Sequence, residues 1–198
     1  LHAAPMFHAA DLLCTAFTLT GAAHAYLPVF SPRAALESIE SYKVTKTMMA
    51  PTMIIMCLTD SEFNKYDTST LKMMLYGSSP MAAEWVEKSI QGFNNTEIVQ
   101  GYGLTECAPI LTFLDWKTHK NAVETGDIEV LRAAGRAIVG LDLKITGHNG
   151  EELTLGEVGE ITVRGPQVSI GYLNRPEENK QSFKEGWFYT GDVGRMDE

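Results

Sequence analysis

Apolar residues in the first hundred positions alternate between the period of a helix and that of a buried strand. They recur at helical spacing from Ala35 to Tyr42, directly after Ser31-Pro32, a pair that favours the N-cap and first position of a helix. The pattern predicts a helix over residues 32–42. Short apolar runs at 23–30 and 47–50, each containing or meeting a proline, predict buried strands on either side.

A second round of the same pattern follows. An apolar run over residues 71–76 predicts a strand, Gly77-Ser78-Ser79 predicts a turn, and apolar residues at helical spacing predict a helix from Pro80 to about Gln91. The run 97–100 then predicts the next strand. Alternating strands and helices of this length are typical of a parallel sheet with crossover helices.

The pattern changes after about residue 113. Short alternating runs are separated by turn sequences such as His148-Asn149-Gly150 and Leu155-Gly156-Glu157, which favour antiparallel hairpins. We therefore expect an α/β protein with a parallel-rich βα subdomain over residues 1–112, followed by a small β-barrel subdomain over residues 113–198. The boundary is soft, between about 112 and 130, because no low-complexity linker marks it.

Composition narrows the class of protein. The 198 residues are 44% hydrophobic with a formal charge of −9, which favours a folded chain and excludes a basic nucleic-acid-binding surface. The three cysteines have no CxxC spacing and are typical of a reduced, cytoplasmic protein. No apolar run is long enough to span a membrane. The chain begins with Leu1, so an N-terminal targeting signal is not readable.

The first candidate site is the turn Tyr76-Gly77-Ser78-Ser79-Pro80, between a predicted strand and a predicted helix. Small residues at such a turn let a ligand approach the backbone, and a helix N-terminus offers unpaired N–H groups. The turn lacks the spacing of a phosphate loop or a dinucleotide fingerprint. An ordinary strand-to-helix connection is the alternative.

The second candidate is Gln100-Gly101-Tyr102-Gly103-Leu104-Thr105-Glu106, directly after the next predicted strand. The aromatic ring can stack on a planar base, the hydroxyl can donate to a phosphate oxygen, and the carboxylate can bind Mg²⁺. This order suits a nucleotide with its metal ion. A glycine-rich strand exit with a solvated glutamate is the alternative.

The third candidate is Tyr189-Thr190-Gly191-Asp192, where a carboxylate after a glycine turn could accept two hydrogen bonds from a ribose diol. A solvated turn residue is the alternative. His8 could line a pocket. The other histidines, at positions 2, 24, 119 and 148, carry no metal-ligand spacing, so no metal cluster of histidine or cysteine is expected.

Taken together and in this order, the motifs resemble the adenylate-forming superfamily, which includes acyl-CoA synthetases, luciferases and peptide-synthetase adenylation domains. The matching segments are Pro5 to His8, Tyr76 to Pro80, Gln100 to Glu106, Gly159 to Glu177 and Tyr189 to Asp192. They extend over nearly the whole chain. The resemblance implies that the fourth segment is scaffold and that the other four line the site.

The resemblance also implies a role for each matching residue. Thr105 and Glu106 are the implied catalytic residues, Glu106 the implied Mg²⁺ ligand, and His8 and Gly77 the implied acyl and coenzyme A contacts. The implied nucleotide-binding residues are Gly77, Ser78, Ser79, Pro80, Gln100, Gly101, Tyr102, Gly103, Leu104, Thr105 and Asp192. Within this set, Tyr102 is expected to stack on adenine and Asp192 to hold the ribose hydroxyls.

The implied activity is that of an acyl-CoA synthetase acting in fatty acid metabolism or on another carboxylic acid. It would form an acyl adenylate from ATP with Mg²⁺ and transfer the acyl group to coenzyme A. Leu104 favours a CoA ligase, since peptide-synthetase domains usually carry proline there. The 198 residues match a fragment of the family's large N-terminal domain. They contain neither its serine- and glycine-rich phosphate loop upstream nor its C-terminal lid downstream. We therefore expect the isolated fragment to be inactive and prone to self-association.

Two other functions remain open at this stage. The chain could be a non-catalytic module that binds a nucleotide or a partner. It could also belong to an adenylating ligase whose acceptor is a carrier protein or oxygen. The sequence does not identify the carboxylic acid.

Overall fold

A computed structural model describes residues 1–7 and 14–197 in two compact units. Unit 1 comprises Leu1–Tyr102 and Thr112–Arg136, and unit 2 comprises Gly103–Leu111 and Ala137–Glu198. The helices are α1 (Cys14–Leu19), α2 (Pro32–Ser41), α3 (Pro51–Thr59), α4 (Ala83–Gly92), α5 (Trp116–Thr125), α6 (Ile128–Arg132) and α7 (Pro176–Ser182). The strands are β1 (Lys46–Met49), β2 (Met73–Gly77), β3 (Glu97–Tyr102), β4 (Thr112–Leu114), β5 (Arg136–Ala137), β6 (Asp142–Thr146), β7 (Gly159–Arg164), β8 (Phe183–Lys184) and β9 (Trp187–Gly194).

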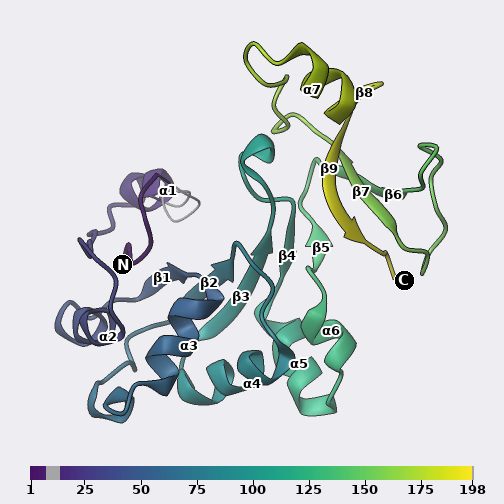
Figure 1. Cartoon of the computed structure of the whole chain (residues 1–198). Coiled ribbons are helices and arrows are strands. Elements are labelled where there is room, and N and C mark those ends of the chain that lie inside the picture. The colour runs from purple at the N-terminus through teal and green to yellow at the C-terminus, as the bar shows by residue number, and fades with distance from the viewer. Residues whose placement is uncertain (8–13, 198) are drawn as a thin grey trace. The chain divides into compact units, whose positions relative to one another are not determined.

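Unit 1 is organised around a sheet with the strand order β1-β2-β3-β4-β5 (Figure 1). The first three strands are parallel, with Met73 opposite Glu97 and Gly77 opposite Gly101, and β4 is antiparallel to β3. Parallel strands need long connections, and here α3 and α4 lie between successive strands in the sequence. The carboxyl ends of β2 and β3 therefore lie side by side.

The core of unit 1 lies between this sheet and its helices. Met74 and Ile98 on the strands pack in one cluster with Leu36 and Ile39 of α2 and Ile54 of α3, and all five are fully buried. The helix α2 begins as its sequence predicts, because the Ser31 hydroxyl accepts a hydrogen bond from the Ala34 N–H at 3.2 Å. Burial of these apolar faces fixes the strand ends that carry the first two candidate motifs.

Unit 2 contains an antiparallel sheet with the strand order β6-β7-β9-β8. It forms a curled half-barrel, and Ile145, Val163 and Phe188 are its buried apolar residues. Pairing between β7 and β9 shifts register between Glu160 and Thr162, which places an irregularity in β9 at residues 190–192. The third candidate motif lies in this irregularity.

The predicted fold class is confirmed: a parallel-rich α/β unit is joined to a barrel-like antiparallel sheet. The strand expected over 23–30 is wrong, since that segment has only an isolated bridge between Tyr26 and His2. Helices α3, α5 and α6 were not foreseen. The segment Thr112–Arg136, expected to begin the β-barrel subdomain, packs with unit 1, and Gly103–Leu111, expected in the βα subdomain, packs with unit 2. Among the described residues, no helix has the length and apolar character needed to cross a bilayer.

Candidate functional site

The first two candidate motifs meet in unit 1 at the carboxyl ends of β2 and β3. Gly77 lies directly opposite Gly101, and a Cβ added at Gly77 would collide with the Gly101 carbonyl oxygen. Any side chain at position 77 would therefore push the two strands apart. Because of this close approach, only backbone atoms line this point at the carboxyl ends of the strands. Ligands bind at this end of open parallel sheets.

The residues after Gly77 turn outward. Ser78 adopts a left-handed conformation with φ of 69°, and Ser78, Ser79 and Pro80 are all exposed. A hollow of about 340 Å³ follows, lined by Pro80, Met81, Ala82, Gln100, Leu131 and Arg132. The helix α4 begins after Ala82, and Tyr102 is half-buried at the end of β3. Unit 1 thus brings the segments 77–80 and 100–102 to one edge of its sheet.

A buried polar cluster that sequence reasoning missed lies behind this edge. The Tyr76 hydroxyl is 2.9 Å from His119 Nε2 and 3.1 Å from the Gln100 side-chain oxygen. His119 Nδ1 donates to the Asp115 carbonyl at 2.9 Å, which leaves the lone pair of Nε2 facing the tyrosine. Burial raises the pKa of Tyr76 and lowers the pKa of His119, so both groups stay neutral near pH 7.

Glu106 lies in unit 2, in the 3₁₀ helix Thr105–Cys107. Its side-chain oxygen accepts a hydrogen bond of 2.7 Å from the Tyr172 hydroxyl, and its carbonyl accepts one of 2.7 Å from the Ser169 N–H. The hydrogen bond to Glu106, followed by burial, raises the pKa of Tyr172 to about 12. Glu106 is therefore a held carboxylate, half-buried and oriented by Tyr172, whereas Thr105 is exposed.

Tyr172 belongs to a segment that the resemblance treats as scaffold, so its contact with Glu106 was not foreseen. The two residues are 66 positions apart, and no local pattern links them. Leu104 is the N-cap of the 3₁₀ helix, and a Cβ at Gly103 would collide with the Pro109 carbonyl oxygen. The loop that carries Glu106 thus packs tightly against the residues that follow it in the chain.

Asp192 is exposed on the irregular part of β9 in unit 2. Gly191 before it has a φ of 78°, and its N–H donates to the Glu160 side chain at 2.9 Å. The Thr190 hydroxyl donates to the Ile161 carbonyl at 2.8 Å and accepts from the Asp192 N–H at 3.1 Å. A bulge of this kind re-aims a side chain out of the regular strand alternation.

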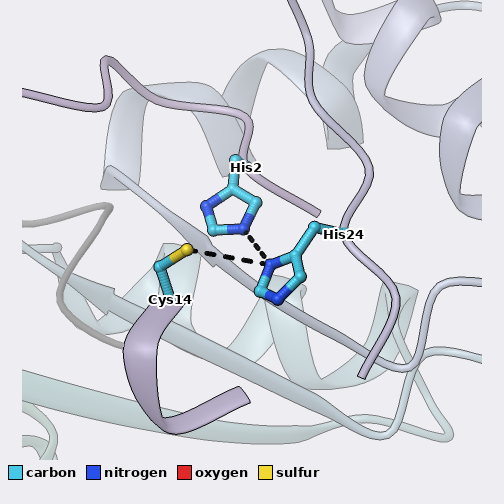
Figure 2. Close-up of side chains that lie close together, drawn as sticks. All are labelled: His2, Cys14 and His24. Atoms are coloured by element: carbon cyan, nitrogen blue, oxygen red, sulfur yellow. Dashed lines mark hydrogen bonds between the residues drawn. The ribbon is translucent and has the colours of Figure 1, made fainter. Parts of the chain in front are cut away.

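Two further expectations concern histidines. His8 lies outside the described residues. The expectation that no histidine or cysteine cluster exists needs correction, because unit 1 brings together His2, Cys14 and His24 with ligand atoms all within 4.8 Å of one another. The cluster was missed because its spacing along the chain resembles no metal motif. Figure 2 shows these three side chains.

Comparison with known proteins decides the family. A profile of the family described as "AMP-binding enzyme" matches residues 1–173, most of the chain. The chain belongs to the AMP-binding enzyme family. The adenylate-forming resemblance that the motifs carry is thereby confirmed, together with the ligase class of its relatives.

Individual relatives of this AMP-binding chain are enzymes of related activities. A feruloyl-CoA synthase from Amycolatopsis sp is 35% identical over 199 residues, which cover 100% of this chain and 38% of that protein. The amide bond synthetase McbA from Marinactinospora thermotolerans has a TM-score of 0.88 at 30% identity, covering 99% of this chain and 38% of that chain. The N-terminal domain of FACL13 from Mycobacterium tuberculosis has a TM-score of 0.83 at 28% identity, covering 99% and 47%.

The AMP-binding chain thus spans 38% to 47% of the length of these relatives. The family has CoA ligases among its members and implies the use of ATP and CoA. The identity of the acid and that of the acyl acceptor are questions about the whole enzyme.

Proposed function

We propose that this chain is part of an ATP-dependent acid–thiol ligase that activates a carboxylic acid as an acyl adenylate and transfers it to coenzyme A. The observation that carries the proposal is the continuous similarity to CoA ligases, which includes 35% identity to a feruloyl-CoA synthase over the full 198 residues. The strand-end geometry of unit 1 supports it, because a nucleotide needs backbone that it can approach closely.

In this proposal unit 1 provides the surface for the base. Gly77 and Gly101 keep side chains away from the sheet edge, and Tyr102 at the end of β3 offers a ring for stacking. Gln100 and the segment 78–80 border the same edge. His8 and Gly77 are proposed to contact the acyl group and the pantetheine of coenzyme A.

Unit 2 provides the polar groups. Thr105 is proposed to donate to a phosphate oxygen, and Asp192 to accept hydrogen bonds from the ribose hydroxyls. Both side chains are exposed and accessible to a ligand. Gly103 and Leu104 shape the loop between Tyr102 and Thr105, and the packing of Gly103 against Pro109 restricts its movement.

The donor set of unit 2 fits a magnesium ion. A carboxylate oxygen is the ligand that Mg²⁺ prefers, and a ligating carboxylate is commonly held by a hydrogen bond from a neighbouring group. Glu106 meets both conditions, since Tyr172 donates to one of its oxygens at 2.7 Å. Bound Mg²⁺ supplies charge neutralisation of the phosphates. Tyr172 keeps the Glu106 side chain oriented and is itself held protonated by it.

A second candidate reaction shares the adenylation step but uses an amine as acceptor. The amide bond synthetase McbA favours it, with a TM-score of 0.88 over 99% of this chain. The acceptor contacts belong to the whole enzyme. Leu104 and the CoA-ligase relatives favour the thiol.

The test uses Glu106→Gln in the whole enzyme, with Glu177→Gln on the exposed first turn of α7 as its matched control. We expect Glu106→Gln to lower pyrophosphate release on the order of 100-fold or more, because charge stabilisation at a reacting phosphate contributes several kcal/mol. The control should match the parent. Unchanged Mg²⁺ dependence in Glu106→Gln would refute the metal role. Product analysis with coenzyme A or an amine as acceptor distinguishes the two reactions.

The 198 residues by themselves should release no pyrophosphate above background with ATP, Mg²⁺, coenzyme A and a panel of fatty and aromatic acids. They contain no glycine-rich loop that ends in a lysine, and Lys88 lies well along α4. Loss of positioning and positive charge costs several powers of ten in rate. Robust turnover by the purified chain would contradict this expectation.

A further inference from the structure

Three potential metal ligands, none of them a residue to which the proposed function gives a role, meet in unit 1. His2 Nε2 lies 2.8 Å from His24 Nδ1, and Cys14 Sγ lies 3.9 Å from the same His24 nitrogen. Figure 2 shows both rings and the sulfur directed toward one another from separate segments of the chain. All three ligand atoms lie within 4.8 Å of one another.

A threonine sets the proton positions of this cluster. The Thr18 hydroxyl has one proton, which it donates to the Cys14 carbonyl at 2.9 Å. It can therefore only accept from His24 Nε2, which lies 3.1 Å away. That hydrogen bond keeps the His24 proton on Nε2 and leaves the Nδ1 lone pair pointing into the cluster. A second hydrogen bond of this kind is what orients histidines that bind metals.

Main-chain hydrogen bonds hold His2 against the segment that follows His24. The His2 N–H donates to the Ala25 carbonyl at 2.8 Å, and the Leu27 N–H donates to the His2 carbonyl at 3.1 Å. The His2 ring stacks on Tyr26 with centroids 4.6 Å apart and an angle of 13°. His2 is only 7% exposed, and Cys14 and His24 are half-buried. These side chains therefore lose little conformational freedom when an ion binds.

The distances are close to those of a zinc site. In a tetrahedral site with Zn–N near 2.0 Å and Zn–S near 2.3 Å, ligand nitrogens lie about 3.3 Å apart and nitrogen and sulfur about 3.6 Å apart. The nitrogen pair here would open slightly from its hydrogen-bonded 2.8 Å, and the sulfur would move closer to His24 from 3.9 Å. Rotation of side chains at χ1 and χ2 covers shifts of this size.

We propose that His2 Nε2, Cys14 Sγ and His24 Nδ1 bind one Zn²⁺ ion, with water as the fourth ligand. Two imidazole nitrogens and one thiolate are a borderline-soft set that suits zinc and disfavours Mg²⁺ and Ca²⁺. On binding, the Cys14 thiol loses its proton to solvent as the Zn–S bond forms. His2 moves its proton from Nε2 to Nδ1, so one proton is released for each ion bound.

The ion would act as a structural link. It would join the N-terminal segment, the start of α1 and the segment before Tyr26, none of which belongs to a strand of the sheet. Because zinc would bind the folded chain and not the unfolded chain, the free energy of unfolding should rise with zinc concentration. The proposal is independent of adenylation, since none of the three residues belongs to the proposed nucleotide site.

Titration of the metal-free 198-residue chain with zinc chloride tests the proposal by calorimetry and thermal melting. We expect one site, a higher Tm, and release of one proton measured from buffers of different ionisation enthalpy. Cobalt(II) titration should give the absorption of a tetrahedral thiolate complex. Cys14→Ser and His24→Ala should each lose more than about 100-fold in affinity, since even outer groups commonly contribute 10- to 100-fold.

Thr18→Val provides a milder variant, which keeps all three ligands but loses the orienting hydrogen bond to His24 and the hydroxyl's hydrogen bond to the Cys14 carbonyl. We expect affinity for zinc to fall about 10- to 100-fold. Thr20→Val is the matched control, because Thr20 bonds only to carbonyls of α1. Cys57→Ala and His148→Ala control for a remote thiol and a remote imidazole. Equal zinc affinity in the parent, Cys14→Ser and His24→Ala, or a cobalt spectrum without thiolate absorption, would overturn the proposal and indicate adventitious binding.

Discussion

Unit 1 brings its candidate site residues together through backbone, whereas unit 2 does so through side chains. In unit 1 Gly77, at the end of β2, lies opposite Gly101 of β3, so close that a Cβ at position 77 would collide with the Gly101 carbonyl oxygen. In unit 2 the Glu106 carboxylate is held by the hydroxyl of Tyr172, from a distant part of the chain. The first arrangement depends on the shape of the sheet edge and the second on a single hydrogen bond.

The two units also hold a tyrosine hydroxyl in different ways. Tyr76 is 1% exposed and faces a neutral His119, and burial alone keeps both groups uncharged. Tyr172 is half-buried and faces a carboxylate, which holds its proton by a charge-assisted hydrogen bond. The pair in unit 1 should therefore respond to acid, through His119, and the pair in unit 2 to alkali, through Tyr172.

The largest effect is expected from Gly77→Ala in unit 1. The added methyl group meets backbone of Gly101 rather than a flexible side chain, so the strands must separate. Overpacking of this kind lowers the free energy of unfolding by about 1–3 kcal/mol, and ATP binding by the whole enzyme should fall with it. Urea denaturation followed by circular dichroism measures the first, and calorimetry the second.

Gly126→Ala is the matched control within the same unit. Gly126 ends α5 with a φ of 70°, and a Cβ there meets no heavy atom within 4 Å. The variant should lose about 1 kcal/mol from left-handed strain and keep its affinity for ATP. If both variants bind ATP as the parent does, the backbone account of the unit 1 site fails.

The local patterns of the sequence predicted the strand ends of unit 1 better than the side-chain contacts of either unit. Strand ends, glycines and the Ser31 cap follow from local patterns, so β1, β2, β3, α2 and α4 appear near their expected places. The contacts of Tyr172 with Glu106 and of Tyr76 with His119 join residues 66 and 43 positions apart. Only tertiary packing brings such pairs together, and no spacing rule reveals them.

The missed elements have similar physical causes. The helix α3 is apolar nearly all round, with Met56 on its exposed face, so its sequence gives only a weak helical period. The segment containing His24 and Tyr26 is apolar and extended, yet it forms single bridges instead of a strand. In both cases, tertiary contacts rather than the local pattern decide the conformation.

The next largest effect is expected on the pKa of Tyr172 in unit 2. Glu106→Gln removes the negative charge that stabilises the phenol, so the pKa of Tyr172 should fall from about 12 toward its ordinary value of 10.0. Alkaline titration by tyrosine absorbance measures the change, with Tyr172→Phe identifying the signal among the seven tyrosines. An unchanged titration in Glu106→Gln would contradict the role of the carboxylate.

The same pair gives a dependence of stability on alkaline pH. The pKa of Tyr172 is higher in the folded chain than in the unfolded chain, so its contribution is complete below about pH 10 and is lost as the pH rises through about 12. Tyr172→Phe should remove this part of the alkaline loss. A parent and a Tyr172→Phe variant with identical alkaline unfolding would show that the hydrogen bond adds nothing to stability.

The smallest effect is expected at His119 in unit 1. Burial holds the pKa of His119 below its ordinary value of 6.5, so the unfolded chain binds a proton first. The contribution to stability is complete above pH 6.5 and is lost as the pH falls through the folded-state pKa, with a slope of at most about 1.4 kcal/mol per pH unit. His119→Gln can still face the Tyr76 hydroxyl but cannot titrate, so its unfolding free energy should depend less on pH in this range. Exposed His148→Gln in unit 2 is the control and should follow the parent. Urea denaturation at pH 7, 6 and 5 measures the difference, and equal pH dependence of the parent and His119→Gln would mean that the buried pair of unit 1 is no more sensitive to acid than the rest of the chain.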